Sequence, residues 1–402
     1  MKILFIGGLF SEKQKIDVYK NSKAMPNMAA NVHQWNIVNG LGANVDIINP
    51  LFVGNFPYEY KKIYLNKEEW SHYEGNHNIS PPTINLFGIK QITRLYTLTK
   101  EIGKWIKKNR TDKVIVLYSL NTSFLFSLIL AQFLYGRTKT CLIVPDLPLF
   151  YINNQGKSKI YRVIKKLDWI VMKKLSKTMD SYILLTKQMK EILDIGQKPY
   201  IVNEGICTDE KYNEQENMIL DKSITYTGTI DREFGVLSLI KNFLNCAEAD
   251  WVLNIAGGGN AQKDVVHYAK KDHRIKYWGV LTNEETKRLQ RTSRILVNPR
   301  SSEEEFTKYS FPSKTMEYLK AGRPIIMHHL PGIPKDYDPY LKYFKNMEDD
   351  AILQGFLEIM SKSDEELNRI GENGKRFVET NKSVYVQGRK IKEFLTQIVH
   401  MY

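Results

Sequence analysis

The stretch RILVNPRSSEEEFTKYSFPSKTMEYLKAGRPIIMH, residues 294–328, decides the fold that we expect for this chain. Its first apolar run, at 294–299, predicts a buried strand. A helix is expected over 314–321, and a second apolar run predicts a strand at 324–328. A strand, a helix and a strand in this order form a crossover unit, which joins parallel strands of one sheet.

The same alternation continues on either side of this unit. Further strands are expected at 2–8, 45–49, 114–120, 141–145, 181–185, 199–202, 223–228, 251–257 and 275–279. Further helices are expected at 28–41, 91–109, 122–135, 157–177, 187–194, 235–245 and 283–291. The chain is therefore expected to be an α/β protein whose sheets are parallel and covered by helices on both faces.

A seam near 203–205 separates two complete sets of strands and helices, and 402 residues suit two domains. We expect two Rossmann-like doubly wound domains that face each other across a cleft, at 1–203 and 204–382. Residues 383–402 are expected to form a helix that returns to the first domain. Ligands of such sheets bind at the carboxyl ends of the strands, so the loops there are where chemistry is expected.

The composition excludes several classes of protein. With 43% hydrophobic and 25% charged residues, the chain is neither disordered nor fibrous. Three cysteines are too few for a disulfide framework, and no apolar signal region follows Met1, which favours the cytoplasm. The uncharged stretch 114–136 is long enough to span a membrane, but Asn121-Thr122-Ser123 interrupts it with turn and helix-capping residues. We interpret it as a strand followed by a buried helix.

The positive charge is concentrated in the first half of the chain. The net charge is +15 over residues 1–200 and −1 over residues 201–402, which indicates a basic face toward something anionic. Residues 157–177 carry eight Lys or Arg against one Asp, and their apolar residues form a stripe at helical spacing. We expect the stripe to pack on the sheet. The residues expected to contact an anionic membrane surface are Lys159, Arg162, Lys166, Trp169 and Lys173.

The segment 296–324 has the residues of an anion site. Ser313 is expected to cap a helix, Lys314 lies beside the free N–H groups of its first turn, and Arg300 follows the preceding strand. Glu317 can accept hydrogen bonds from both hydroxyls of a ribose, although it could instead only complement the helix dipole. These residue types suit a nucleotide.

Glycine turns follow two of the expected strands, and both are candidates for close approach to a phosphate. They are Gly7-Gly8 and Gly257-Gly258-Gly259. The first could equally be a simple tight turn. It does not have the GxGxxG pattern, and Asn49-Pro50 stands where an acidic ribose partner would follow the second strand, which disfavours a nicotinamide cofactor.

The segment PRSSEEEFTKYSFPSKTMEYLKAGRPII resembles the donor-binding segment of family 4 glycosyltransferases of bacterial surface-polysaccharide biosynthesis. YTGTIDREFGV (226–236), LNIAGGG (253–259), IKYWGVLTNEE (275–285) and ILVNPR (295–300) are similar to that family's other motifs in the same order. The resemblance implies the GT-B fold, with the nucleotide-sugar bound mainly by the second domain. The donor-binding residues that we expect are Gly8, Thr229, Arg232, Gly258, Val280, Arg300, Ser313, Lys314 and Glu317.

The chain departs from the family pattern at several of these positions. Glu317 matches the second Glu of the family's Glu, seven residues, Glu motif, but Tyr309 stands at the first, and Glu305 is the nearby candidate for the sugar hydroxyls. The family's Arg and Lys after the glycine turn fall at Thr229 and Phe234, so the diphosphate needs other cations. Arg300, Lys314 and Arg232 are the candidates.

Asp146 is the candidate catalytic residue of the first domain, together with Glu305 of the second. It stands near the end of an expected strand where the family often has a His, and it could orient an acceptor hydroxyl or take its proton, or only cap the following turn. The histidines lack metal-ligand spacing, so we expect neither a metal nor a cofactor.

The resemblance and the basic first half together predict an enzyme. We expect it to transfer a sugar from a nucleotide-sugar, with UDP as the expected nucleotide, to a polyprenyl-diphosphate-linked saccharide. The transfer is expected to retain the anomeric configuration, and the enzyme to be peripheral on the inner face of the cell membrane. A nucleotide-sugar epimerase of the same fold and a non-catalytic protein that binds anionic lipid are the alternatives. Nucleic acid is not expected as a partner, because aromatic platforms are not interleaved with the basic residues.

Overall fold

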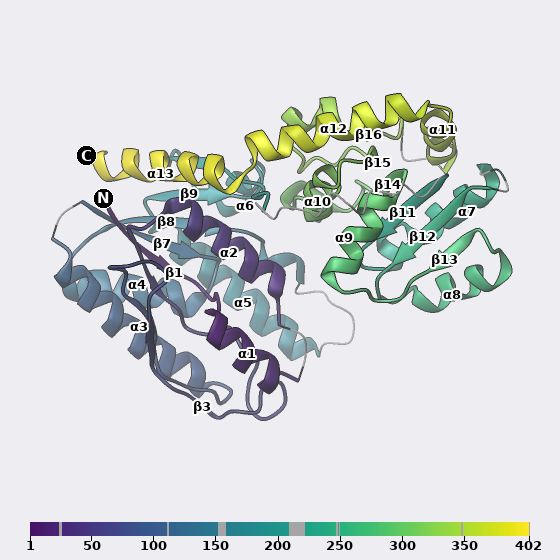
Figure 1. The fold of residues 1–402 in the computed structure, drawn as a ribbon. Coiled ribbons are helices and arrows are strands. Elements are labelled where there is room, and N and C mark those ends of the chain that lie inside the picture. The colour runs from purple at the N-terminus through teal and green to yellow at the C-terminus, as the bar shows by residue number, and fades with distance from the viewer. Residues whose placement is uncertain are drawn as a thin grey trace. The chain divides into compact units, whose positions relative to one another are not determined.

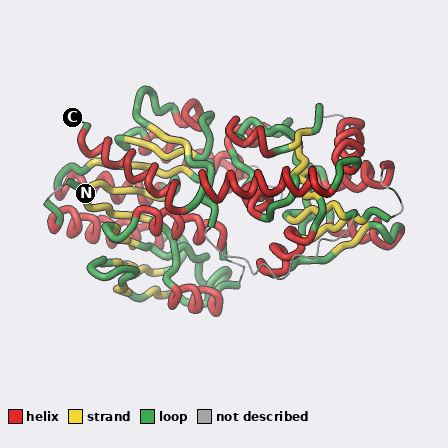
Figure 2. The backbone as a smooth tube through the Cα atoms, turned by 45° about the horizontal axis from the view of Figure 1, so that its top comes forward, coloured by secondary structure: helices red, strands yellow, loops and turns green. Residues whose placement is uncertain are grey.

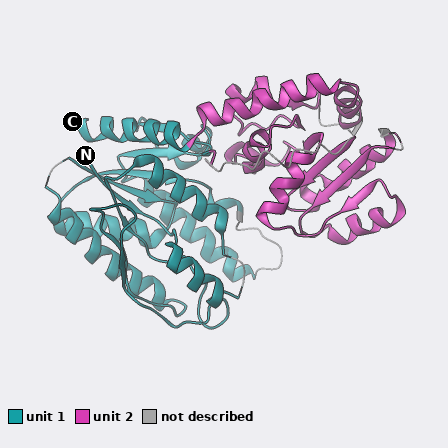
Figure 3. Ribbon diagram, viewed as in Figure 1, with its two compact units in different colours: residues 1–206, 384–402 teal, residues 207–383 magenta. Residues whose placement is uncertain are grey.

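A computed structural model shows two compact units. Unit 1 comprises residues 1–206 and 384–402, and unit 2 comprises residues 207–383 (Figure 3). These limits lie within three residues of the expected boundaries. The structure describes residues 1–23, 26–110, 112–151, 158–208, 222–246, 248, 250–346 and 349–401.

Unit 1 contains an eight-stranded sheet in the order β10-β9-β8-β7-β1-β2-β5-β4, in which only the edge strand β4 is antiparallel to its neighbour. Its strands are β1 (Lys2–Ile6), β2 (Val45–Ile48), β4 (Glu68–Trp70), β5 (Asn78–Ser80), β7 (Lys113–Tyr118), β8 (Lys139–Val144), β9 (Ser181–Leu184) and β10 (Tyr200–Val202). A separate hairpin pairs β3 (Tyr64–Leu65) with β6 (Thr83–Ile84). Apart from Lys2, Lys113 and Lys139 at their starts, the four central strands β1, β2, β7 and β8 are fully buried, because helices cover both faces.

The helices of unit 1 form a layer on each side of the sheet (Figure 1). They are α1 (Glu12–Asn21), α2 (Met28–Leu41), α3 (Ile89–Lys108), α4 (Thr122–Tyr135), α5 (Lys159–Ser176), α6 (Met189–Leu193) and α13 (Val384–His400). On one face α2 packs against α13, and on the other α4 packs between α3 and α5. The uncharged stretch 114–136 is thus the strand β7 and the helix α4, as expected.

The C-terminal helix α13 is part of unit 1, and two glycines make this possible. A Cβ atom on Gly388 would lie 2.2 Å from the carbonyl oxygen of Gly40, so only glycine permits α13 to cross α2 this closely. Asn203 donates a hydrogen bond from Nδ2 to Oε1 of Gln387 at 2.8 Å, and Lys390 donates to the carbonyl oxygen of Val202 at 2.8 Å. These contacts fix the last helix beside the end of β10.

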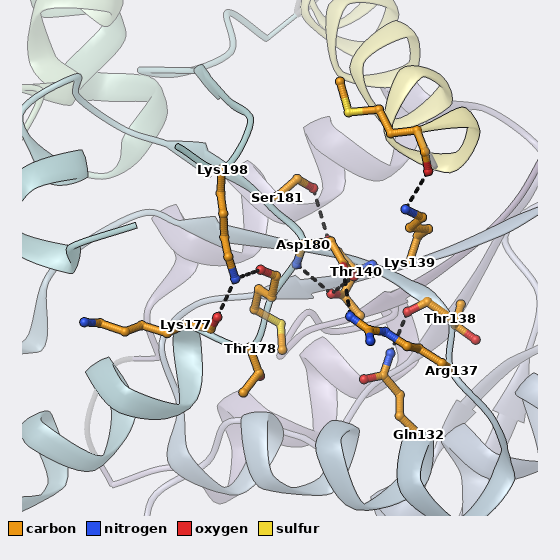
Figure 4. A network of polar contacts seen from close by, with 12 residues as sticks. Gln132, Arg137, Thr138, Lys139, Thr140, Lys177, Thr178, Asp180, Ser181 and Lys198 are labelled. Carbon is orange, nitrogen blue, oxygen red and sulfur yellow. Dashed lines mark hydrogen bonds and ion pairs between the residues drawn. The ribbon is translucent and has the colours of Figure 1, made fainter. Parts of the chain in front are cut away.

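The amino ends of β8 and β9 are closed by a polar network (Figure 4). The Asp180 carboxylate accepts hydrogen bonds from the backbone N–H and the hydroxyl of Thr140, at 2.8 and 2.7 Å, and lies 3.6 Å from the Arg137 guanidinium. Lys198 donates to the carbonyl oxygen of Met179 at 2.6 Å, and Lys139 donates to that of Met401 at 2.7 Å. Because these groups satisfy one another, this edge of the sheet has a structural role.

Unit 2 contains a six-stranded, wholly parallel sheet in the order β13-β12-β11-β14-β15-β16. Its strands are β11 (Ser223–Thr227), β12 (Val252–Ala256), β13 (Ile275–Tyr277), β14 (Ile295–Asn298), β15 (Ile325–Met327) and β16 (Lys342–Tyr343). Its helices are α7 (Val236–Cys246), α8 (Gln262–Lys271), α9 (Asn283–Thr292), α10 (Ser313–Lys320), α11 (Asp349–Met360) and α12 (Asp364–Asn381). Figure 2 shows helices flanking the strands on both sides. The α/β fold with two doubly wound units is therefore confirmed.

The sequence analysis did not anticipate every element. The helices α1, α8, α11 and α12 were not expected, and residues 51–88, expected to be irregular, contain the short strands β3 to β6. The expected strands and helices otherwise correspond to observed ones, with ends that differ by at most two residues.

Candidate donor-binding site

The sheet of unit 2 brings several predicted residues to one edge. Its strand order is 3-2-1-4-5-6 in terms of chain order, so the direction of winding reverses between β11 and β14. Ligands of such sheets bind at the carboxyl edge near this reversal. Val280, Gly258, Thr229 and Arg300 follow β13, β12, β11 and β14 respectively, and therefore lie in that order along the edge.

Glycines allow the loops at this edge to touch. A Cβ atom on Gly257 would lie 1.8 Å from the carbonyl oxygen of Gly228, and one on Gly235 would lie 2.4 Å from that of Pro299. Gly257 and Gly235 also have φ angles of +139° and +78°, which favour glycine. The backbone N–H of Ile230 donates to the carbonyl oxygen of Gly258 at 2.9 Å. The loops after β11, β12 and β14 thus form one continuous backbone surface.

Arg300 is held between two aromatic rings at the winding reversal. Its guanidinium carbon lies 4.9 Å from the ring centroid of Phe234, in the loop after β11, and 4.3 Å from that of Phe306. Its positive charge also lowers the pKa of Tyr226, although burial raises that pKa more strongly. Stacking on two rings restricts the side chain, so the guanidinium is oriented before any ligand binds.

The helix α10 places Lys314 and Glu317 on one face. Tyr318, fully buried, accepts a hydrogen bond at its hydroxyl from the N–H of Thr227 at 2.8 Å and donates to the carbonyl oxygen of Thr227 at 3.0 Å. Residues 314 and 318 are one turn apart on the same side of the helix. Tyr318 therefore fixes the side of α10 that carries Lys314 toward the end of β11.

Lys314 and Glu317 pair with each other in the unliganded chain. The ammonium of Lys314 lies 2.8 Å from a carboxylate oxygen of Glu317, and both side chains are partly exposed. An exposed pair of this kind contributes about 0–1 kcal/mol to stability, so a ligand can replace it at little cost. The expectation that Ser313 caps α10 is wrong: Pro312 is the N-cap, with no side-chain hydrogen bond, and Ser313 is the first helical residue. The backbone N–H groups of the first turn therefore have no side-chain cap.

The remaining predicted residues of unit 2 lie at the borders of this edge. Arg232 is exposed, and its guanidinium pairs with Asp264 on α8 at 2.6 Å. Glu305 is exposed and begins a short 3-10 helix at Glu305–Tyr309, next to Phe306. Thr229 accepts a hydrogen bond at its carbonyl oxygen from the hydroxyl of Tyr226 at 2.7 Å, and Val280 is 79% exposed.

Gly8 of unit 1 does not have the free N–H group that the sequence analysis expected. It is buried, and it donates a hydrogen bond from its backbone N–H to Oε1 of Gln34 at 2.8 Å. A Cβ atom at this position would lie 1.7 Å from the ring of Phe52. Glycine is therefore required here for packing, and the N–H is already satisfied inside unit 1.

Asp146 lies two residues beyond the end of β8, beside two groups that the sequence did not connect with it. Asp146 is exposed, and partial desolvation by the protein around it raises the pKa of its carboxyl above the ordinary aspartate value. Burial, with a smaller contribution from the Asp146 charge, raises the pKa of Tyr118. The ring of His33 lies 5.9 Å from that of Tyr118, and burial lowers the pKa of His33 to about 4. At neutral pH this cluster contains a neutral imidazole.

The expected orientation of α5 is wrong. Its apolar stripe does not pack on the sheet: Ile160, Val163 and Leu167 are 73%, 59% and 58% exposed. Trp169, expected at the membrane surface, is instead buried with Met172, because the second half of the helix packs inward. Lys159, Arg162 and Lys166 are exposed and Lys173 is partly so, and all four lie on the same helix as the exposed stripe. Residue 157, where the helix was expected to begin, lies outside the described residues.

The part of the chain that the structure describes contains neither a metal-ligand cluster nor a membrane-spanning helix. No group of three or more His, Cys, Asp or Glu side chains in this part of the chain is placed to hold a metal ion. No helix among the described residues has both the length and the apolar character needed to cross a membrane.

Sequence reasoning missed Tyr318, Phe234 and Phe306 as site residues because aromatic residues in such segments are usually core. Their positions in the sequence could have indicated a role in the site. Tyr318 stands one helical turn after Lys314, and Phe234 and Phe306 lie in the segments that follow β11 and β14, next to Arg300. His33 was noted as an isolated histidine, and only the packing of α2 beside β7 brings it to Tyr118.

Comparison with known proteins agrees with this architecture. Residues 221–359 match the family described as "Glycosyl transferases group 1". No curated protein matches the chain. Among solved structures, the chain is similar to sucrose-phosphate synthase from Thermosynechococcus elongatus, at 13% identity and a TM-score of 0.61 over 99% of both chains.

Two further solved structures share the fold at low identity. One is an alpha,alpha-trehalose-phosphate synthase (UDP-forming) from Burkholderia xenovorans in complex with glucose-6-phosphate, at 8% identity and a TM-score of 0.64 over 98% of this chain and 100% of the other. The other is the catalytic domain of starch synthase IV from Arabidopsis thaliana bound to ADP and acarbose, at 9% identity and a TM-score of 0.61 over both whole chains.

The fold is therefore that of the GT-B glycosyltransferases, and the chain is an enzyme of the glycosyltransferase class. More particularly, the match to the family described as "Glycosyl transferases group 1" covers most of unit 2.

Proposed function

We propose that unit 2 binds a nucleotide-sugar, with UDP as its nucleotide, as the donor of a glycosyl transfer. The observation that carries this proposal is the arrangement of Arg300, Lys314 and Glu317 with the glycine loops at the winding reversal of the sheet. Glu317 would accept the ribose hydroxyls, while Lys314, Arg300 and the uncapped start of α10 would bind the diphosphate. Since the diphosphate leaves with negative charge, the same cations would stabilise the transition state.

Arg300 supplies the positive charge that the chain lacks at position 234, in the loop after β11. In the family pattern a Lys falls at position 234, where this chain has Phe234. The guanidinium of Arg300 stacks on the ring of that same Phe234. We infer that the guanidinium of Arg300, which follows β14, occupies the region where the family's Lys at position 234 would place its ammonium group.

A thermal-shift screen against a panel of nucleotide-sugars tests the donor site. A bound donor at 100 times its Kd stabilises the protein by about 2.7 kcal/mol. We expect Arg300→Ala and Glu317→Ala to lose this stabilisation and most transfer activity. Arg369→Ala, an exposed arginine on α12 of the same unit, is the control and should respond like the wild type. A normal response of both site variants would contradict the assignment.

The acceptor, in our proposal, is a lipid-linked saccharide such as a polyprenyl-diphosphate conjugate in surface-polysaccharide synthesis, reached at the inner face of the cell membrane. Support comes from α5, where exposed apolar side chains lie beside exposed lysines and arginine. Each Lys or Arg near an anionic surface contributes about 1 kcal/mol of attraction, and the apolar side chains can enter the headgroup region. Asp146 is our candidate for orienting the acceptor hydroxyl, with retention of configuration as the family resemblance implies.

Vesicle binding tests the membrane part separately. Ile160 on α5 and Ile16 on α1 are both 73% exposed, so Ile160→Glu and Ile16→Glu are a matched pair with little effect on stability. We expect the wild type and Ile16→Glu to sediment with vesicles that contain phosphatidylglycerol, and Ile160→Glu to do so several-fold less. Equal sedimentation of the two variants would contradict membrane contact through α5.

A further inference from the structure

Unit 1 carries a groove that the proposed donor site does not use. Its volume is about 690 Å³, within the usual range of ligand pockets. The start of α1, one side of α2 and the segment 68–73, which contains β4, line it. We call it the aromatic groove, because its defining side chains are Trp35, Trp70, His72 and Tyr73.

The four rings of the aromatic groove form a contiguous cluster. The ring centroids of Trp35 and Trp70 are 5.8 Å apart, and His72 lies 5.9 Å from Trp35, 6.2 Å from Trp70 and 5.1 Å from Tyr73. Trp35 is fixed by the hydrogen bond from its Nε1 to the carbonyl oxygen of Phe10 at 2.8 Å. Tyr73 is 42% exposed. The groove therefore offers a rigid apolar wall with one accessible ring at its rim.

Two N–H donors within this wall have no partner. Asn78 accepts at Oδ1 from the N–H of Ile47 at 3.1 Å, so its amide nitrogen faces Nδ1 of His72, at 2.8 Å. Nδ1 is then the acceptor, and since burial lowers the pKa of His72, the ring is neutral and carries its proton on Nε2. Nε2 of His72 and Nε1 of Trp70 are both buried without a hydrogen-bond partner. Both nitrogens are shielded from solvent, so the two rings offer a ligand in the groove their apolar surface rather than these N–H groups.

The rest of the groove is polar and nearly neutral. The side-chain amides of Asn36 and Asn39, on the α2 side, make no hydrogen bond to any described residue. Two of the ionic groups in the lining pair with each other, since Lys13 lies 3.4 Å from Glu68. Such a surface does not select for a strongly charged ligand. It selects for one that has apolar faces and many hydroxyl groups.

We propose that the aromatic groove binds the saccharide chain of the acceptor. The C–H faces of pyranose rings suit the indole and phenol rings, while sugar hydroxyls can exchange hydrogen bonds with the two asparagines. From Met28 to Asn39 the groove follows α2 for about 16 Å at 1.5 Å per residue, which fits an oligosaccharide better than one sugar. The inference rests on the proposed transfer to a saccharide, but it concerns binding alone.

A glycan array of neutral mono- and oligosaccharides, probed with the full chain in the absence of any nucleotide-sugar, tests the proposal. We expect oligosaccharides to bind and monosaccharides to bind weakly. Trp70→Phe replaces the indole with a smaller ring and so reduces the apolar face that a pyranose can contact; it should weaken binding about tenfold. Tyr73→Ala should weaken it similarly. Tyr19→Ala, an equally exposed tyrosine (43%) on α1 outside the groove, is the control.

The experiments distinguish a failure of the saccharide-binding proposal from a failure of the donor-site proposal. Glu317→Ala should bind oligosaccharides like the wild type, and the groove variants should keep their thermal response to the nucleotide-sugar. The proposal is overturned if no oligosaccharide on the array binds, or if Trp70→Phe and Tyr73→Ala bind as tightly as Tyr19→Ala.

Discussion

Removal of the Tyr318 hydroxyl should both destabilise unit 2 and weaken donor binding. In Tyr318→Phe the N–H of Thr227 stays buried but loses its acceptor, which lay 2.8 Å away. An unsatisfied buried donor costs about 1–3 kcal/mol. For a unit of this size, that corresponds to a fall in Tm of about 2–12 °C. Because the same hydroxyl fixes α10 to β11, the KM for the donor should also rise several-fold.

Tyr226→Phe is the matched control for this experiment. Its hydroxyl makes a single hydrogen bond, to the carbonyl oxygen of the exposed Thr229, where water can take its place. We expect a loss of about 1 kcal/mol and an unchanged donor KM. The assays are calorimetric unfolding and donor-saturation kinetics. If Tyr318→Phe keeps the Tm and KM of the wild type, α10 is not held by this hydroxyl and our account of the site is refuted.

Three further outcomes are expected. Gly257→Ala should lower Tm far more than Gly258→Ala, because only the first places a Cβ atom 1.8 Å from a backbone oxygen, at a φ of +139°; equal Tm values would contradict this. In the folded protein burial lowers the pKa of His33 to about 4, so the free energy of unfolding should fall as the pH drops from about 6.5 to 4. Chemical denaturation of His33→Gln should show a smaller fall over the same pH range. Folding raises the pKa of Asp146, so Asp146→Asn should raise Tm at pH 7, and that gain should vanish at low pH; a constant difference across pH would argue against it.

The sequence predicted most strands of both sheets because each of these is a short apolar run between turn residues, whereas the short strands β4, β5 and β16 have no such run and were not predicted. Ile224 and Val297, for example, lie in such runs and are fully buried. The loops that carry the donor-site residues follow from the same rule, since the carboxyl ends of parallel strands share an edge. The helices that were missed were α1, α8, α11 and α12. Two of them, α1 and α8, each bury a single apolar residue, Val18 and Val265, so neither has a long apolar stripe.

Helical periodicity could not decide the role of α5. A stripe of apolar residues fits a core-facing helix and an exposed one equally, and the outcome depends on what lies opposite. In the structure Trp169 and Met172 fill the space under α5, while the stripe that the sequence assigned to the core is left in solvent. Gly8 shows the same limit, because the ring that covers it belongs to Phe52, far along the chain.

The sequence alone determined the parallel α/β architecture, the two sets of strands and the identity of the charged residues near the donor site, because these depend on local patterns of apolar, turn and charged side chains. The tertiary structure decided which of those residues act together. Arg300 meets Phe234, and Tyr318 meets Thr227, across 66 and 91 positions of sequence. No local pattern encodes such contacts, since they arise only when separate strands and helices pack at one edge of a sheet.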